Sequence, residues 1–141
     1  MVKISVLVDN NSIIDRYYRS EPALSLWIEA AGSPVLLDTG YSGAFLENAL
    51  KMHKDPAALS HVVLSHGHFD HTWGLSELVR YFTEGTIEDQ LENRPQVVAH
   101  PQCFDSKIVT DIGSIGSMFS RETLERFFPV IETREPFWLD G

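Results

Sequence analysis

The chain has 141 residues, of which 43% are hydrophobic and 22% charged, with 20 acidic and 11 basic side chains. This length and composition are those of one globular domain that buries a substantial core. The formal net charge of −9 excludes the broad basic surface with which proteins bind nucleic acid or anionic membranes, although a bound metal ion would still let a local site attract an anionic small molecule.

Nothing in the sequence indicates a membrane or secreted protein. No apolar run approaches the roughly 20 residues of a membrane-spanning helix, and residues 1–8 lack the hydrophobic segment of a signal peptide. Cys103 is the single cysteine, so no intrachain disulfide is expected. A buried, unreactive thiol is the favoured interpretation for Cys103, ahead of a reactive one. The sequence therefore predicts a cytoplasmic protein.

Three strands are predicted near the start of the chain. Apolar and polar residues alternate from Val2 to Val8, as is typical of a strand with one buried face. A second alternation, from Leu24 to Ala30, leads to a turn at residues 31–34, and residues 35–37 return as its hairpin partner. The polar and aromatic residues 13–23, between the first two strands, are expected to be irregular.

A helix and a short turn are predicted next. Ser42 is a candidate N-cap for apolar residues at helical spacing between positions 45 and 50. His53 lies at the polar end of this helix, where we expect a structural or solvated side chain. Asp55 and Pro56 are the residue types of an N-cap and a first helical position, and they predict a short turn.

The strongest chemical signal follows residues 62–64, a short apolar run that predicts a buried strand. The next residues, 65–71, read Ser-His-Gly-His-Phe-Asp-His and contain His66, His68, Asp70 and His71. Imidazole and carboxylate are ordinary zinc ligands. One metal ion could take His66 and His68, and a second could take Asp70 and His71, so that the pair activates a water. The plainer alternative is a polar loop with solvated histidines.

The residues around this motif are expected to be structural. His61 precedes the strand without a partner at ligand spacing, so it is expected to lie outside the site. Apolar residues from 75 to 82 predict an amphipathic helix, with Gly85 as its C′ residue. Trp73 either packs beside the metal loop or lines a pocket there. The acidic residues 84–94 are expected to form a solvated loop.

His100 follows a predicted short strand, residues 97–99, and precedes Pro101, which suits the first position of a brief helix. Because it leaves the end of a strand, as the metal motif does, it is expected near the site. Three roles stay open: a metal ligand, a substrate contact, or a buried histidine held by hydrogen bonds.

The remaining chain is predicted from weaker signals. The Gly- and Ser-rich residues 110–119 predict a flexible loop over the mouth of the site. Ser120 is a candidate N-cap for a helix that Pro129 ends. Residues 130–131 and 137–139 are candidate strands.

These motifs resemble those of a known superfamily. The motif at 65–71 resembles the signature of the metallo-β-lactamase superfamily, and Val-Leu-Leu-Asp-Thr-Gly at 35–40 resembles its upstream strand ending in Asp-Thr-Gly. Three further segments are similar to a branch that includes dihydropterin–ribofuranosylaminobenzene phosphate synthase, namely 7–11, 24–29 and 99–101. Together the similarities cover most of residues 4–101.

The resemblance implies an α/β fold. The superfamily has an αββα sandwich, and residues 1–141 resemble, as a single domain, only its first sheet-plus-helices half with a short tail. By the resemblance, further metal ligands (a histidine, a bridging acid and a last histidine) belong to C-terminal segments that this chain does not contain. We therefore expect the sheet face that such segments would cover to be apolar and to favour self-association.

The resemblance also implies a zinc-dependent hydrolase. His66 and His68 would bind the first zinc ion, and Asp70 and His71 the second, with iron or manganese as other candidate metals. Asp70 would orient a metal-bound hydroxide that attacks an ester, thioester, amide or phosphoester of a small molecule, which can be anionic. Asp38 would sit behind the loop and orient it by hydrogen bonds. The alternative for Asp38 is a turn former at the end of a strand.

Two other functions remain open. The first is a catalytically incomplete module that binds metal or dimerises and needs a second half, supplied by a homo-oligomer or by a partner subunit. The missing ligands favour it. The second is an iron-dependent oxidoreductase of the same superfamily. The single cysteine and the absence of a flavin-binding motif argue against that reading.

Overall fold

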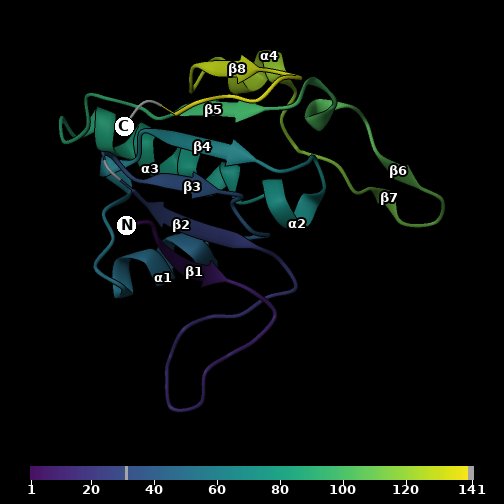
Figure 1. The fold of residues 1–141 in the computed structure, drawn as a ribbon. Coiled ribbons are helices and arrows are strands. Elements are labelled where there is room, and N and C mark those ends of the chain that lie inside the picture. Colours follow the sequence, from purple (N-terminus) through teal and green to yellow (C-terminus); the bar gives the residue numbers. More distant parts are fainter. Residues whose placement is uncertain (31, 140–141) are drawn as a thin grey trace.

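A six-stranded sheet organises the structure, a computed structural model that describes residues 1–30 and 32–139 (Figure 1). The strands lie in the order β1-β2-β3-β4-β5-β8. Their bounds are Lys3–Val8, Ser25–Glu29, Val35–Leu37, His61–Leu64, Gln96–Ala99 and Val130–Glu132. The first three strands form an antiparallel meander, and the other pairs are parallel. The alternating patterns at the start of the chain thus predicted its strands, but not the face that they bury. Ile4 and Val6, expected inside, are 59% and 47% exposed, whereas Trp27 of β2 is buried.

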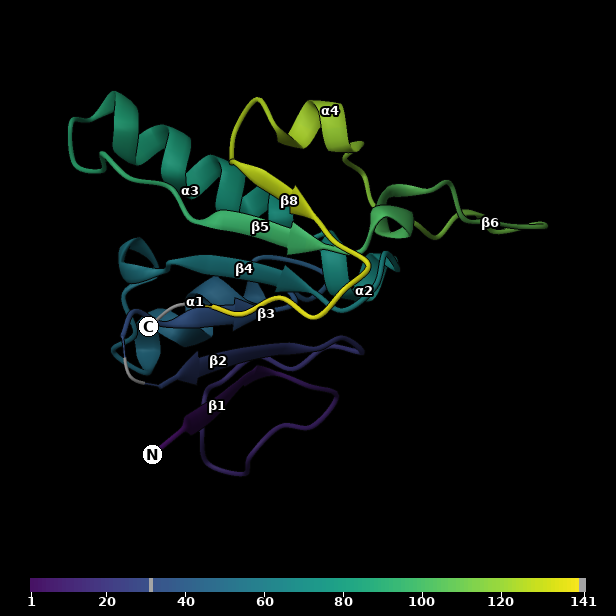
Figure 2. The ribbon, with the colours of Figure 1, turned by 45° about the horizontal axis from the view of Figure 1, so that its top comes forward.

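The core lies between this sheet and the helices of one face (Figures 1 and 2). The helices are α1 (Ala44–Lys51), α3 (Leu75–Ile87) and the single turn α4 (Arg121–Leu124). The strand register places Trp27, Leu36, Val62 and Val97 in one buried row across the sheet. Phe45, Leu78, Phe82 and Phe128 cover this row from the helix side. Within the described residues, no helix has the length and apolarity to cross a bilayer.

The opposite face of the sheet carries a second apolar row. The register joins Val6, Leu26, Leu37, Val63, Val98 and Ile131 across all six strands. The segment after β8 turns back over this face, where the Phe137 ring lies 6.3 Å from that of His61 (Figure 2). Val98 is consequently buried, whereas Val6 is 47% exposed at the β1 end. The predicted apolar face is therefore present but partly covered by the chain itself.

Two helix boundaries differ from the sequence prediction. Gly85 does not end the helix but lies inside α3, which continues to Ile87. A Cβ on Gly85 would meet Leu91 Cδ1 at 2.4 Å, so this glycine allows the following segment to pack on the helix. Gly43, not Ser42, is the N-cap of α1, although the Ser42 hydroxyl still accepts from the Ala44 N–H at 3.2 Å while it donates to Glu21 at 2.6 Å.

The C-terminal third differs in two further places. The predicted loop at 110–119 contains part of a hairpin, formed by β6 (Ile108–Val109) and β7 (Gly113–Ser114), which projects from the body (Figure 1). Residues 137–139 do not form a strand. This segment crosses the face of the sheet, so it has no free strand edge with which to pair. The remaining short helices, η1 (Pro56–Ala58) and η2 (Pro101–Phe104), follow their predicted Asp-Pro and His-Pro starts.

Candidate metal centre

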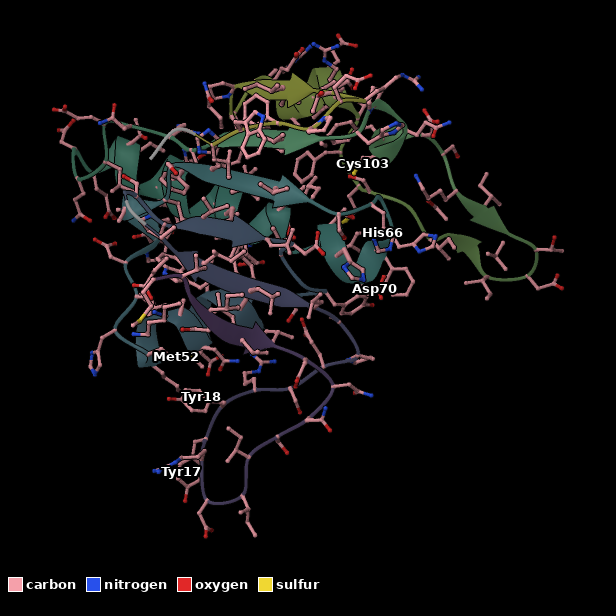
Figure 3. All side chains as sticks on the ribbon, in the orientation of Figure 1. Tyr17, Tyr18, Met52, His66, Asp70 and Cys103 are labelled. Atoms are coloured by element: carbon pink, nitrogen blue, oxygen red, sulfur yellow. The ribbon has the colours of Figure 1, made fainter. Side chains whose placement is uncertain are left out.

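The metal motif lies where β4 ends and a single helical turn begins. The sequence suggested a loop, but Phe69–Thr72 form a short helix, α2, with His68 in extended conformation as its N-cap. Asp70 and His71 therefore sit in the first turn of a helix, while His66 stays on the linker from the strand. This turn folds the second half of the motif back toward the first (Figure 3).

Three side chains of the motif converge. One ligand atom from each of His66, Asp70 and His71 lies within 4.8 Å of the other two. The shortest of these approaches that involves the carboxylate is 3.4 Å, between His71 Nε2 and Asp70 Oδ2. The His66 and His71 ring centroids are 4.1 Å apart. Two imidazoles and one carboxylate are the number and type of protein ligands found at catalytic zinc sites.

His68 lies beside this group and not within it. Its ring centroid is 4.8 Å from that of His66, and its side chain is exposed. The sequence spacing paired His66 with His68, and Asp70 with His71. The structure instead brings His66 together with the second pair, because the α2 turn carries Asp70 and His71 back over the linker.

Asp38 supports the centre from behind, as the resemblance implied. Its carboxylate is fully buried and accepts hydrogen bonds from the Ser65 backbone N–H at 2.8 Å, the Ser65 hydroxyl at 2.6 Å and His71 Nδ1 at 2.7 Å. Its φ of 58° is left-handed, a conformation that Asp tolerates better than most residues. The next residue, Thr39, holds the His71 carbonyl through both its backbone N–H and its hydroxyl.

These hydrogen bonds fix the tautomers of both converging histidines. His71 Nδ1 faces a carboxylate, so it carries the hydrogen and leaves the Nε2 lone pair free. The single hydroxyl hydrogen of Ser65 is donated to Asp38, so the 2.9 Å contact between Ser65 Oγ and His66 Nδ1 requires His66 to be the donor. Both imidazoles thus present Nε2 as a metal ligand.

Burial and neighbouring charge favour the neutral form of His66. Partial burial is the largest cause of the lowered pKa of its imidazole, and repulsion from His71 and His68 adds to it. A metal ligand must be unprotonated, so this shift reduces the competition between protons and metal at His66.

Two glycines let the motif pack closely against its supports. A Cβ on Gly67 would lie 1.9 Å from the Cys103 carbonyl oxygen, and a Cβ on Gly74 would lie 2.0 Å from the Thr39 carbonyl oxygen. Backbone cannot yield as a side-chain tip does, so each position requires glycine. No role was predicted for Gly67, Gly74, Ser65 or Thr39, although each stands within or beside the two recognised motifs.

The residues predicted to lie outside the centre do so. His53 is exposed after α1, and His61 contacts Ser60 and Phe137 at the start of β4, the end opposite the motif. Cys103 is buried, and burial raises the pKa of its thiol to about 11, in agreement with the predicted unreactive cysteine. Trp73 packs, stacking on Tyr41 and donating to the Gly116 carbonyl at 2.8 Å.

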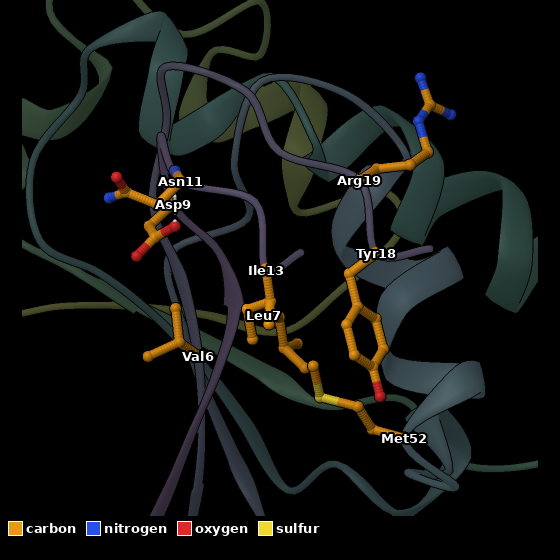
Figure 4. Close-up of a pocket in the computed structure, with 8 residues that line it drawn as sticks. All are labelled: Val6, Leu7, Asp9, Asn11, Ile13, Tyr18, Arg19 and Met52. Carbon is orange, nitrogen blue, oxygen red and sulfur yellow. Dashed lines mark hydrogen bonds between the residues drawn. The ribbon is translucent and has the colours of Figure 1, made fainter. Parts of the chain in front are cut away.

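A second hollow lies far from the motif, between β1, the loop that follows it and the end of α1 (Figure 4). Val6, Leu7, Ile13 and Met52 give it a largely apolar wall, with Tyr18 beside Met52. Figure 3 shows Tyr18 and Met52 well separated from His66 and Asp70. The converging imidazoles and carboxylate therefore make the motif, and not this hollow, the candidate site for chemistry.

Comparison with known families agrees with this geometry. The model of the metallo-β-lactamase superfamily matches residues 19–140. The chain belongs to the metallo-β-lactamase superfamily. Among solved structures, this superfamily member is similar to Tm1679, a metal-dependent hydrolase of the β-lactamase superfamily, with a TM-score of 0.71 and 25% identity. It also shares its fold with the metallo-β-lactamase fold protein YhfI from Bacillus subtilis, with a TM-score of 0.65 and 18% identity.

Two curated relatives from one organism are similar to part of the chain. The uncharacterized protein MJ0448 of Methanocaldococcus jannaschii is 31% identical over 104 residues, which are 74% of this chain and 36% of that protein. The 7,8-dihydropterin-6-methyl-4-(β-D-ribofuranosyl)-aminobenzene-5′-phosphate synthase of the same organism is 26% identical over 115 residues, which are 78% of this chain and 36% of the synthase.

The superfamily member described here matches only part of each relative. The structural alignments cover all of this chain but 45% of Tm1679, and 98% of this chain but 50% of YhfI. The chain thus spans about a third of the curated relatives and about half of the solved structures. The mixed, mostly parallel sheet with helices on one face is the portion of the metallo-β-lactamase fold that these alignments share.

Proposed function

We propose that this chain is a zinc-dependent hydrolase, acting on an ester, thioester, amide or phosphoester of a small molecule. The observation that carries the proposal is the convergence of His66, Asp70 and His71 within 4.8 Å on a loop fixed by a buried carboxylate. Membership of the metallo-β-lactamase superfamily and the similarity to a metal-dependent hydrolase support it.

Each residue of the centre has a role that follows from its contacts. His66 and His71 would hold the metal through Nε2, and Asp70 through a carboxylate oxygen, with the exposed His68 available for a second ion. A divalent cation bound there lowers the pKa of a coordinated water and so supplies a nucleophile near neutral pH. Asp70 can accept a hydrogen bond from the attacking water and aim it, and Asp38 keeps His71 in the ligating tautomer.

The test measures metal content and hydrolysis together. The purified chain is analysed for zinc, iron and manganese per molecule and then assayed on a panel of esters, thioesters, amides and phosphoesters with and without chelator. We expect bound zinc and a chelator-sensitive activity that Asp70→Asn removes and His61→Gln preserves, because His61 lies at the opposite end of β4. Activity that survives complete metal removal would exclude the proposed mechanism.

A second candidate function has its own supporting observation. The centre draws its converging ligands from one segment of six residues, and the chain spans about half of the structures it matches. A metal-binding or dimerisation module that gains its remaining ligands from a second copy or a partner subunit would have these properties. A dimeric mass in solution, with zinc bound only in the dimer and no hydrolysis on the panel, would favour this alternative.

A further inference from the structure

His100 lines a hollow beside the metal centre. The walls of this hollow, which encloses about 220 Å³, come from the start of the metal loop, residues 65–67, and from His100, Gln102, Cys103 and Lys107. None of these residues is acidic, although the chain as a whole has a net charge of −9. His66 belongs both to this wall and to the converging ligands, so the hollow opens directly next to the candidate metal.

The tautomer of His100 follows from its position as the N-cap of η2. Its Nδ1 accepts a hydrogen bond from the Gln102 backbone N–H at 3.2 Å. An accepting Nδ1 carries no hydrogen, so the neutral ring carries it on Nε2. His100 therefore offers a hydrogen-bond donor, whereas His66 and His71 offer lone pairs. A histidine that binds a metal through Nε2 needs a free lone pair on that atom, which His66 and His71 have and His100 lacks.

A fixed positive charge stands on the same wall. The Lys107 ammonium donates to the carbonyl oxygens of Gln102, Cys103 and Asp105 at 3.0, 3.3 and 3.0 Å. These partners are neutral carbonyls, so they hold the lysine in place without cancelling its charge. Its Nζ lies 2.7 Å from where a Cβ on Gly67 would be, which places the charge against the metal loop.

The remaining wall does not oppose this charge. Burial raises the pKa of the Cys103 thiol to about 11, so near neutral pH it is an uncharged S–H group. The charges of Asp38 and Glu132 act on the Cys103 thiol, but neither side chain lines the hollow, whose wall therefore combines an N–H donor and a positive charge without a carboxylate. This is the environment that an anionic oxygen favours, since a hydrogen bond to a charged group is worth more than one between neutral groups.

We propose that this hollow binds an anionic oxygen group of the substrate, a carboxylate or a phosphate, with His100 Nε2–H as the donor and Lys107 as the compensating charge. Calling the bound molecule a substrate rests on the proposed hydrolase function, and the inference adds that this substrate is anionic. His100 acts as a substrate-binding residue, and it holds one end of the molecule while the scissile bond lies at the metal centre.

The test uses the full chain loaded with zinc and probes binding without turnover. Nitrogen-15 NMR of the histidine rings first reads the tautomer of His100, which we expect to carry its hydrogen on Nε2. Inorganic phosphate and acetate are then titrated in separately, and saturable movement of the His100 signal by either identifies the preferred anion. A hydrogen on Nδ1, or a His100 signal that neither anion moves, would overturn the inference.

Two substitutions separate binding from structure. Asn and Asp both cap helices well, so His100→Asn and His100→Asp keep the bond from Gln102 while removing the Nε2–H donor. We expect phosphate or acetate binding, followed by calorimetry, to weaken about tenfold or more in His100→Asn and further in His100→Asp, whose charge repels the anion, with zinc content unchanged in both. Loss of zinc would identify His100 as a ligand, and unchanged anion binding would reduce it to a cap; both outcomes refute the proposal.

The same variants keep this inference separate from the proposed function. Anion binding at His100 in a chain that hydrolyses nothing would leave the hollow established and the hydrolase refuted. Hydrolysis in which His100→Asn leaves the KM for an anionic ester the same as in the unsubstituted chain would leave the hydrolase established and the hollow refuted.

Discussion

Replacing Asp38 by Asn tests how far the metal centre depends on its support. Asn has nearly the shape of Asp and also tolerates a left-handed φ, so the backbone at 58° can be kept. If the amide oxygen retains the bond from the Ser65 N–H, the amide NH₂ group faces the Ser65 hydroxyl and His71 Nδ1. Two donors then oppose each other, and His71 must move its hydrogen to Nε2, the atom that binds metal.

The size of the effect follows from these contacts. Removing a buried partner that orients a metal-binding histidine typically weakens metal binding by about 10- to 100-fold, or about 1.4 to 2.8 kcal/mol. The same change replaces charge-assisted hydrogen bonds to a buried carboxylate by neutral ones, which costs about 1 to 2 kcal/mol of folding free energy. Asp38→Asn should therefore lower both zinc affinity and the stability of the metal-free chain.

Zinc affinity is measured by competition with a chromophoric chelator, and stability by urea denaturation of the metal-free chain. Ser65→Ala is the matched control, because it removes the hydroxyl bond to Asp38 but leaves the bond between Asp38 and His71. We expect it to lose less zinc affinity than Asp38→Asn. Zinc affinity of Asp38→Asn within about threefold of the unsubstituted chain, or a larger loss in Ser65→Ala, would refute this account of His71.

Three further predictions concern packing and pH. Gly67→Ala should destabilise the chain by about 1 to 3 kcal/mol in urea and reduce zinc content, since its Cβ would lie 1.9 Å from the Cys103 carbonyl. Because the folded state lowers the pKa of His66, the unfolded chain binds more protons between that value and about 6.5, so the stability of the metal-free chain should fall as pH drops through this window. Phe82→Ala should cost about 3 to 5 kcal/mol with zinc content unchanged, because Phe82 is fully buried beneath the sheet.

Each of these predictions has a distinct control. Gly113→Ala probes a glycine with nothing within 4 Å of its added Cβ, on the projecting hairpin, and zinc loss there equal to that of Gly67→Ala would contradict the contact argument. His66→Gln should weaken the dependence of folding stability on pH below about 6.5. If the slope of stability against pH is unaltered, the pH dependence comes from other groups. Zinc loss in a folded Phe82→Ala chain would show that the core and the centre are coupled.

Much of the fold could be predicted because its signals are local. The alternations at Lys3–Val8 and Ser25–Glu29 indicated strands, although their alternating apolar residues lie on the more open face of the sheet, and the cap residues Asp55 and Ser120 accept the expected backbone bonds. The metal motif was recognisable because its ligands lie within six positions. Gly85 was misread, since a glycine that allows a distant residue to pack has the same sequence signal as one that ends a helix.

The geometry of the site was less predictable, because it depends on contacts between segments. The grouping of His66 with Asp70 and His71 requires the α2 turn. This helix is only four residues long, too short to show a helical pattern in the sequence. The tautomer of His66 depends on Ser65 being bonded to Asp38, 27 positions earlier. The role of His100 likewise becomes definable only when η2 is seen to pack on Gly67.

The closeness of the metal ligands in sequence also bears on folding. A ligand stabilises a protein only to the extent that it binds the native state more tightly than the unfolded one. His66, Asp70 and His71 span six residues, so the unfolded chain retains part of the same affinity for zinc. What the unfolded chain lacks is the hydrogen bond between His71 and Asp38, which lies far from it in the sequence. The rise in melting temperature on adding zinc should thus report the contribution of Asp38 and fall short of the value calculated from the dissociation constant.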